Sequence, residues 1–132
     1  YNTFIRNQAM ETTFADFAAT QQARNDIQLK IVEHCWELCD KLTEDFARRH
    51  PKSSMEFLLD SSGRKYHKIW QISGSNGSKS CHAFIDRKTG EVYKPASYKA
   101  PAKIVRYRLL EIASREECFN RADWAGSYLY VR

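Results

Sequence analysis

The spacing of apolar residues in the first half of the chain predicts a long amphipathic helix. Between about Ala23 and Arg49, apolar residues recur every three or four positions, which is the period of one helical face. The stripe consists of Ile27, Ile31, Cys35, Leu38, Leu42 and Phe46. Charged residues fill most of the other positions. Pro51 follows a cationic last turn, so the helix is expected to end just before it.

The residues before this helix are predicted to form a separate arm. Phe14, Phe17 and Ala18 have the spacing of one helical face, and Thr13 is a suitable N-cap residue. We therefore expect a short helix over residues 13–22. Residues 1–22 would form an N-terminal arm, and residues 23–132 a single domain.

From Met55 onward, short alternating segments predict β-strands. The expected strands cover residues 55–59, 65–73, 79–86 and 91–94, with a hairpin turn ending at Gly90. In the third strand, Cys81, Ala83 and Ile85 are expected on one face, with His82 and Phe84 on the other. The short connections favour an antiparallel meander with one face packed on the long helix.

Residues 95–132 are predicted to form an irregular loop, a strand and a short helix. Residues 95–103 contain two prolines and three alanines, and residues 104–112 alternate like a further strand. Ser114 and Glu117 have the spacing of a capping box, and Gly126 suits a helix C-terminus. Residues 128–131 would close the chain as an edge strand. The predicted fold is α+β, with a long N-terminal amphipathic helix on a four- to five-stranded antiparallel sheet and a short C-terminal helix.

The composition agrees with a single globular domain. The chain has 132 residues, of which 42% are hydrophobic and 28% are charged. No uninterrupted apolar run is long enough to span a bilayer, so no membrane partner is expected. The first twenty residues contain one Arg and no apolar core of a signal peptide, so we expect a protein of the cell interior with reduced thiols.

The basic residues are unevenly distributed and predict a site for an anionic partner. Residues 87–108 hold seven basic residues and one acidic residue, a net charge of +6, while the rest of the chain carries −1. Lysines neutralise phosphates, and tyrosine rings stack on exposed bases, so nucleic acid is the expected partner. The candidate contact residues are Tyr93, Lys94, Tyr98, Lys99, Lys103, Arg106 and Arg108. The alternative is a solvated basic surface that maintains solubility.

Catalytic and metal-binding candidates are weaker in this sequence. His67 and His82 fall on neighbouring predicted strands, where two imidazoles in one pocket could exchange protons with a substrate. Cys35, Cys39, Cys81 and His82 could assemble a metal site, although they lack the closely spaced ligand pairs of most structural zinc sites. Histidines with ordinary hydrogen bonds and buried, reduced thiols are the commoner explanation of the two sets. We expect no cofactor.

Two segments resemble small uncharacterised proteins of marine tailed phages. They are HAFIDRKTGEVYKPASYKAPAK, from His82 to Lys103, and RADWAGSYLYVR, from Arg121 to Arg132, and the resemblance covers roughly residues 82–132. The resemblance implies a location in the cytoplasm of a bacterial host or in the virion. It implies no particular activity and no catalytic residues.

The leading functional hypothesis is a non-enzymatic phage-type accessory protein that binds nucleic acid through the basic segment. The first alternative is a virion structural protein or a module that binds a host protein, with Phe14, Phe17 and the Tyr128–Tyr130 edge as contact residues. The second alternative is a small enzyme that uses His67 and His82.

Overall fold

The computed structural model describes residues 2–131, with side chains described from Phe14 onward, and confirms the α+β class. The helices are α1 (Asn2–Arg49), α2 (Ile112–Arg121) and the 3-10 turn η1 (Ser127–Leu129). The strands are β1 (Met55–Asp60), β2 (Tyr66–Ser73), β3 (Lys79–Asp86), β4 (Glu91–Tyr93) and β5 (Tyr107–Arg108). They form one antiparallel sheet in sequential order.

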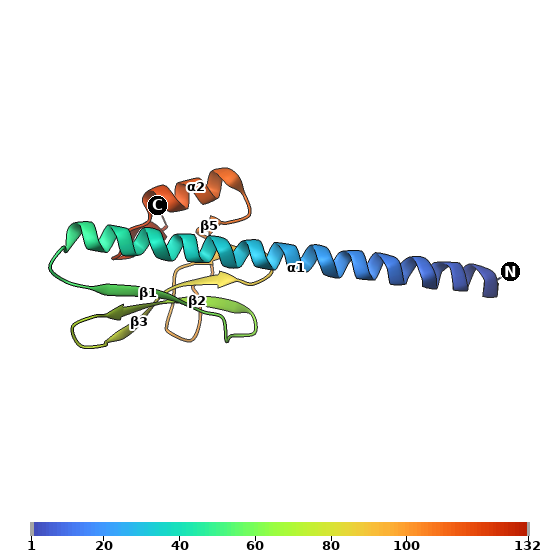
Figure 1. The fold of residues 1–132 in the computed structure, drawn as a ribbon, viewed down its shortest axis with the longest axis horizontal. Helices are drawn as coiled ribbons and strands as arrows, with labels where there is room; N and C mark the ends of the chain where they lie inside the picture. The colour runs from blue at the N-terminus through green and yellow to red at the C-terminus, as the bar shows by residue number, and fades with distance from the viewer. Residues whose placement is uncertain (1, 132) are drawn as a thin grey trace.

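Helix α1 is one continuous helix, so the predicted break between the arm helix and the long helix is wrong. No Gly or Pro occurs between Asn2 and Arg49, and the segment from Ala18 to Ala23 consists largely of good helix formers. The helix therefore runs through Thr13, which cannot act as its N-cap. It ends at Arg49, two residues before Pro51, as predicted. Figure 1 shows its N-terminal part extending well beyond the sheet.

The core lies between the inner face of the sheet and the C-terminal part of α1 (Figure 1). Helix α1 contributes Ile31, Cys35, Leu38, Leu42 and Phe46, which are the predicted stripe without Ile27. The sheet contributes Phe57, Ile69, Ala83, Ile85, Val92 and Tyr107. Ile27 is 41% exposed because α1 has already left the sheet at that point. Among the described helices, none is both long and apolar enough to cross a membrane.

A bulge in β3 changes the predicted distribution of its side chains. Ile69 pairs with Ala83, but the next residue, Trp70, pairs with Cys81, so His82 is the extra residue. His82 consequently faces the core, where it packs edge-on against Phe57 at 5.3 Å between ring centres. Cys81 lies opposite Trp70, on the outer face of the sheet. The predictions that His82 shares a face with Phe84 and that Cys81 shares one with Ala83 and Ile85 are therefore wrong.

Helix α2 packs beside α1 through Cys118, which is fully buried. It begins at Ile112 with Glu111 as the N-cap residue, so the predicted capping box is wrong. The Ser114 hydroxyl instead accepts a hydrogen bond from the backbone N–H of Arg108, at 2.7 Å. This bond ties the start of α2 to β5. The strand predicted over residues 104–112 is reduced to β5, which pairs only with β4.

The C-terminal segment forms η1 where an edge strand was predicted. Tyr128 is 2% exposed and stacks between His82 and Tyr107, at 5.6 and 5.9 Å between ring centres. Gly126 has a positive φ of 81° and precedes η1, whereas Ala122 is the C-cap of α2. The neighbouring residues Tyr128 and Leu129 are both buried, which the alternation of an edge strand does not allow. The predicted edge strand and the predicted helix C-terminus at Gly126 are therefore both wrong.

Candidate nucleic-acid interface

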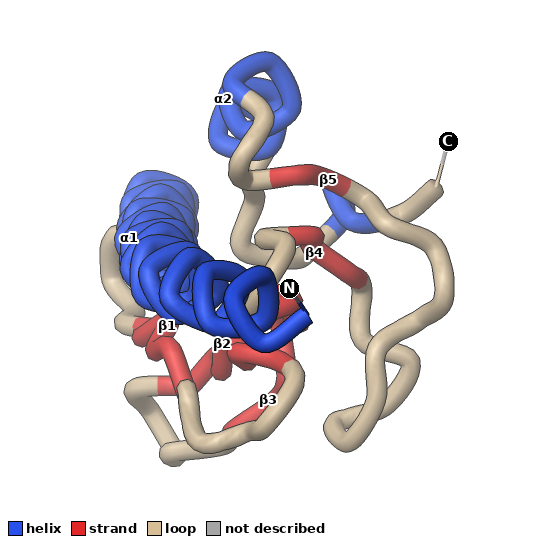
Figure 2. Tube along the Cα trace, turned by 90° about the vertical axis from the view of Figure 1, so that its right-hand side faces the viewer, coloured by secondary structure: helices blue, strands red, loops and turns tan. Residues whose placement is uncertain are grey.

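The predicted basic segment contains a long loop that leaves β4 and returns to β5 (Figure 2). The loop is closed at its base, where the N–H of Ala102 donates to the carbonyl of Lys94 at 2.7 Å. Its tip is held by a 2.9 Å bond from the N–H of Ala96 to the carbonyl of Ala100. Tyr98 at the tip is 60% exposed. The loop is thus an ordered hairpin-like projection that presents its tip to solvent.

The loop tip lies against the outer face of the sheet, which faces away from α1. The ammonium group of Lys68 on β2 donates to the carbonyl oxygen of Tyr98 at 2.7 Å. Lys68 pairs with Phe84, which in turn pairs with Tyr93, so these three side chains lie on the same outer face. We name this surface the lysine–aromatic face. Its members are Lys65, Tyr66, Lys68, Trp70, Lys79, Phe84, Tyr93, Tyr98 and Lys99.

The lysines of this face lie over aromatic rings. The Nζ of Lys79 is 4.1 Å from the centre of the Trp70 ring. The Nζ of Lys68 is 5.5 Å from the same ring and 5.2 Å from the Phe84 ring. Lys65 lies over Tyr66 at 5.4 Å, and Lys99 over Tyr98 at 5.5 Å. Each such contact is worth about 0.5–1 kcal/mol at an exposed site, so it orders the lysine without immobilising it.

Acidic side chains border the face, and two of them are committed to turns. Asp60 accepts hydrogen bonds from the Ser62 hydroxyl at 2.6 Å, from the Trp70 indole N–H at 3.0 Å and from the Ser62 backbone N–H at 2.9 Å. These bonds hold the pKa of Asp60 well below its usual range. Asp86 accepts from the N–H groups of Lys88 and Thr89. Glu56 lies on the outer face of β1, at the edge of the sheet.

Two of the predicted basic residues bind other groups of the protein, and two others are exposed to solvent. Arg106 donates to the carbonyl of Leu129 at 2.5 Å and also to that of Ile104, so it holds the C-terminal segment in place. Arg108 pairs with Glu91 at 3.2 Å and lies 3.9 Å from Glu111. Lys99 and Lys103, by contrast, are exposed. Lys94 lies over the Tyr130 ring at 4.8 Å, and Tyr93 meets Tyr66 edge-on at 6.0 Å.

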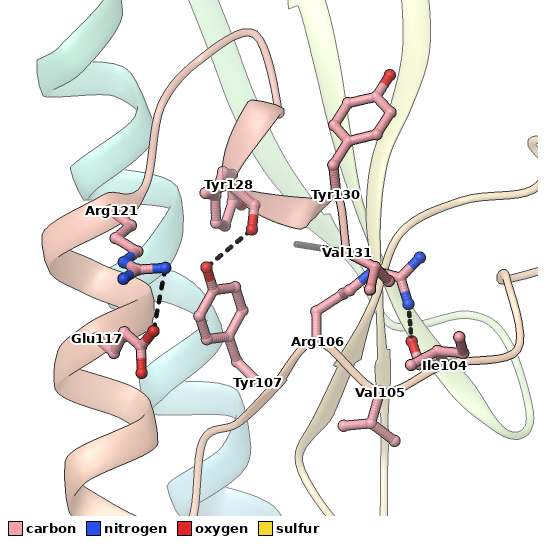
Figure 3. A pocket seen from close by; sticks show the side chains of 9 residues that line it. All are labelled: Ile104, Val105, Arg106, Tyr107, Glu117, Arg121, Tyr128, Tyr130 and Val131. Atoms are coloured by element: carbon pink, nitrogen blue, oxygen red, sulfur yellow. Dashed lines mark hydrogen bonds and ion pairs between the residues drawn. The ribbon is translucent and has the colours of Figure 1, made fainter.

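A hollow of about 200 Å³ lies between α2 and the C-terminal segment (Figure 3). Its polar groups already bind one another. The hydroxyl of Tyr107 donates to the carbonyl of Tyr128 at 2.8 Å, and Arg121 pairs with Glu117 at 3.2 Å. Figure 3 shows Arg106 turned toward Ile104 and away from Tyr107. Several of the polar groups that line the hollow are therefore already bound within the protein.

The two histidine candidates are not brought together. His67 accepts a hydrogen bond from the Ser61 hydroxyl at 2.7 Å and lines a hollow beside α1 with Arg87. His82 binds the Tyr128 hydroxyl at 2.8 Å and lines a different hollow, next to Lys94. Burial lowers the pKa of both imidazoles to about 4, and the nearby Arg87 contributes to the shift at His67. Both rings are neutral near pH 7 and have the partners of structural core residues.

The metal candidates are also separated. Cys35 and Cys39 lie in the core with Cys118, while Cys81 lies on the outer face of the sheet. Burial raises the pKa of Cys39 and Cys118 to about 12, and that of Cys81 to about 11, so these thiols are protonated. Within the described residues, no group of three or more His, Cys, Asp or Glu side chains is placed to hold a metal ion.

The proposed protein-contact residues fall into exposed and buried groups. Phe14 and Phe17 are 74% and 58% exposed on the free part of α1. Tyr130 is 59% exposed, but Tyr128 is in the core. Only the arm therefore presents both of its predicted aromatic contacts to solvent.

Charge along the sequence gives no indication of Lys65, Lys68, Lys79 and Trp70, because none of them lies in the basic segment. Sheet pairing places Lys68, Trp70 and Lys79 on the outer face, and Lys68 reaches the loop tip. The period-two alternation of Tyr66, Lys68 and Trp70 along one strand was the available indication. The alternation alone does not show which face of the strand packs on the helix and which face points away from it.

Comparisons with known proteins identify the family without a function. No curated protein and no solved structure matches this chain. One family model, described as a family of unknown function (DUF7717), matches residues 14–131. The match begins in the free part of α1 and includes the whole sheet, α2 and η1. This chain is therefore a member of the DUF7717 family.

Proposed function

We propose that this protein is a non-enzymatic module that binds nucleic acid through the lysine–aromatic face and the adjoining loop. The observation that carries the proposal is the convergence of charge and rings on one surface. Lys68 and Lys79 from the strands, and Lys65 just before β2, join Lys99 from the loop, and each lies over an aromatic ring. On the resemblance described above, the setting would be a phage-infected bacterium or a virion.

The chemistry of this surface suits phosphate better than a carboxylate-bearing small molecule. Lysine ammonium groups act as point charges that need only proximity to a phosphate, and flexible stems let them follow an irregular backbone. Lys68, Trp70 and Lys79 line none of the hollows described above, whereas small ligands are usually enclosed in concave pockets. A polyanion that contacts several lysines at once matches this geometry.

The test is binding of labelled oligonucleotides across a salt series, with the Lys99→Glu/Lys103→Glu double variant. Wild-type affinity should fall linearly with salt on logarithmic axes. The double variant should bind at least about tenfold more weakly, with a slope smaller by about one to two. The matched control is Lys41→Glu/Lys52→Glu, which makes the same charge change at exposed positions outside the face.

Each result of this test has a defined meaning. Loss of binding in the loop variant but not in the control supports the proposal. Equal loss in both variants would show a non-specific effect of net charge, and equal affinity in all three proteins would exclude the loop as a contact.

A second candidate function is protein binding through the arm, and the exposure of Phe14 and Phe17 favours it. Two exposed phenylalanines one turn apart on a free helix are typical of a helix that binds a protein surface. Substitution of both by Ser would then abolish association with the partner and leave nucleic-acid binding unchanged, which a pull-down and an oligonucleotide assay would separate.

A further inference from the structure

We propose that the nucleic acid is single-stranded and that Trp70 is the platform on which one of its bases stacks. In the free protein, the ammonium groups of Lys68 and Lys79 lie over the Trp70 ring. When a base stacks on the ring, they move away from it and pair with phosphates. This inference rests on the proposed function, because it specifies the ligand of the same face.

The Trp70 ring is held in place before any ligand binds. Its indole N–H donates to the Asp60 carboxylate at 3.0 Å, which fixes the side chain across the β1–β2 pair. The ring is half-buried, and Leu58, directly opposite on β1, is 40% exposed. A ring whose orientation is already fixed loses little conformational entropy when a base stacks on it.

The energies favour replacement of the lysines by a base. Displacement costs each lysine its cation–π contact with Trp70, and it costs Lys68 its hydrogen bond to the Tyr98 carbonyl as well. A stacked base replaces these contacts with a stronger one on the ring, and both released ammonium groups then pair with the phosphate backbone. The lysines therefore shield the ring from water in the free protein and are displaced at little net cost.

The geometry also distinguishes a single strand from a duplex. The rings lie on the surface of a sheet, and base faces are available to such a surface only when the bases are unstacked. Tyr98, 60% exposed at the loop tip, provides a second ring, and its carbonyl is bound to Lys68 beside Trp70. A duplex would reach the lysines through its phosphates alone and would gain nothing from Trp70.

The experiment measures the anisotropy of a labelled twelve-nucleotide single strand and of a hairpin duplex with the same number of phosphates. Trp70→Leu should weaken single-strand binding by about five- to a hundredfold and leave duplex binding unchanged. Trp70→Phe, which keeps an aromatic face, should restore most of the affinity. Trp36→Leu is the matched control, because Trp36 is 43% exposed on α1, outside the face.

The outcomes separate this inference from the proposed function. Circular dichroism and thermal melting establish that each variant is folded, and the Trp70→Phe variant carries the test where Trp70→Leu does not fold. If Trp70→Leu and the loop charge variant weaken single-strand binding independently, both proposals are supported. If only the charge variant does so, stacking on Trp70 is excluded and the proposed function stands. If the wild-type protein binds neither oligonucleotide at low salt, both proposals are excluded.

Discussion

Buried polar side chains connect the separate parts of this core at specific atoms. Asp45, 4% exposed near the end of α1, accepts from the backbone N–H of Trp124 at 3.0 Å and pairs with Arg48 and Arg49. His82 links the β3 bulge to Tyr128. Each bond satisfies a buried group whose desolvation would otherwise cost about 1–3 kcal/mol, so these residues specify how the C-terminal segment docks.

The two buried histidines predict that stability falls in mildly acidic solution. Their pKa values drop from 6.5 to about 4 on folding, so the unfolded chain binds more protons between these values. Stability is complete above pH 6.5 and is lost as the pH falls toward 4, by about 2 kcal/mol per histidine between pH 7 and pH 5. Urea unfolding at these two pH values measures the effect.

Substitutions show whether the histidines are responsible. His82→Gln should lose part of this pH dependence, whereas His50→Gln, a change at an exposed position at the end of α1, should retain it. An unfolding midpoint in the wild-type protein that is equal at pH 7 and pH 5 would contradict the assignment of neutral, buried imidazoles.

Helix α1 consists of a C-terminal half that packs on the rest of the protein and an N-terminal half whose described side chains are almost all exposed to solvent. Its packed half is buried from Ile31 onward, against the sheet on one side and α2 on another. From Phe14 to Lys30 its side chains are exposed, apart from a half-buried Gln21. Helical structure in the free half is an extension of the packed half, because elongation of an existing helix avoids the cost of nucleation.

This division predicts that removal of residues 1–22 leaves the body folded. The deletion removes no fully buried side chain among those described, so the melting temperature should change by only a few degrees. Far-ultraviolet circular dichroism should lose helical signal while tryptophan fluorescence remains native. A cooperative loss of folding in the truncated protein would instead show that the arm packs on the body.

At the scale of the whole molecule, the free half of α1 makes the protein elongated. A helix of 48 residues is about 70 Å long, and the sheet covers only part of it (Figure 1). A compact chain of this length would have a radius of gyration of about 14 Å.

Small-angle X-ray scattering of the monomer should therefore give a radius of gyration well above about 14 Å and a maximum dimension of at least about 70 Å. The truncated protein without residues 1–22 is the control and should approach the compact value. A compact full-length protein would contradict the free arm.

Local patterns along the chain are sufficient to predict several elements of this fold. The stripe from Ile31 to Phe46, the end of α1 before Pro51 and the four strands through β4 follow from period, turn residues and proline. These features depend on neighbours in the chain, so a one-dimensional pattern contains them. The basic character of the loop at Lys94, Lys99 and Lys103 was visible for the same reason.

Only the tertiary structure decided which side chains meet. The bulge at His82 reverses the expected faces of His82 and Cys81, and a register shift of this kind depends on the partner strand rather than on the alternation within β3. Tyr128 becomes a core residue because its ring fits between His82 and Tyr107. Arg106 and Arg108 leave the candidate interface because carbonyls and carboxylates from distant segments bind them first. The lysine–aromatic face arises in the same way, from sheet pairing that places Lys68 and Lys79 on one face and brings Lys68 to a loop 30 residues away in sequence.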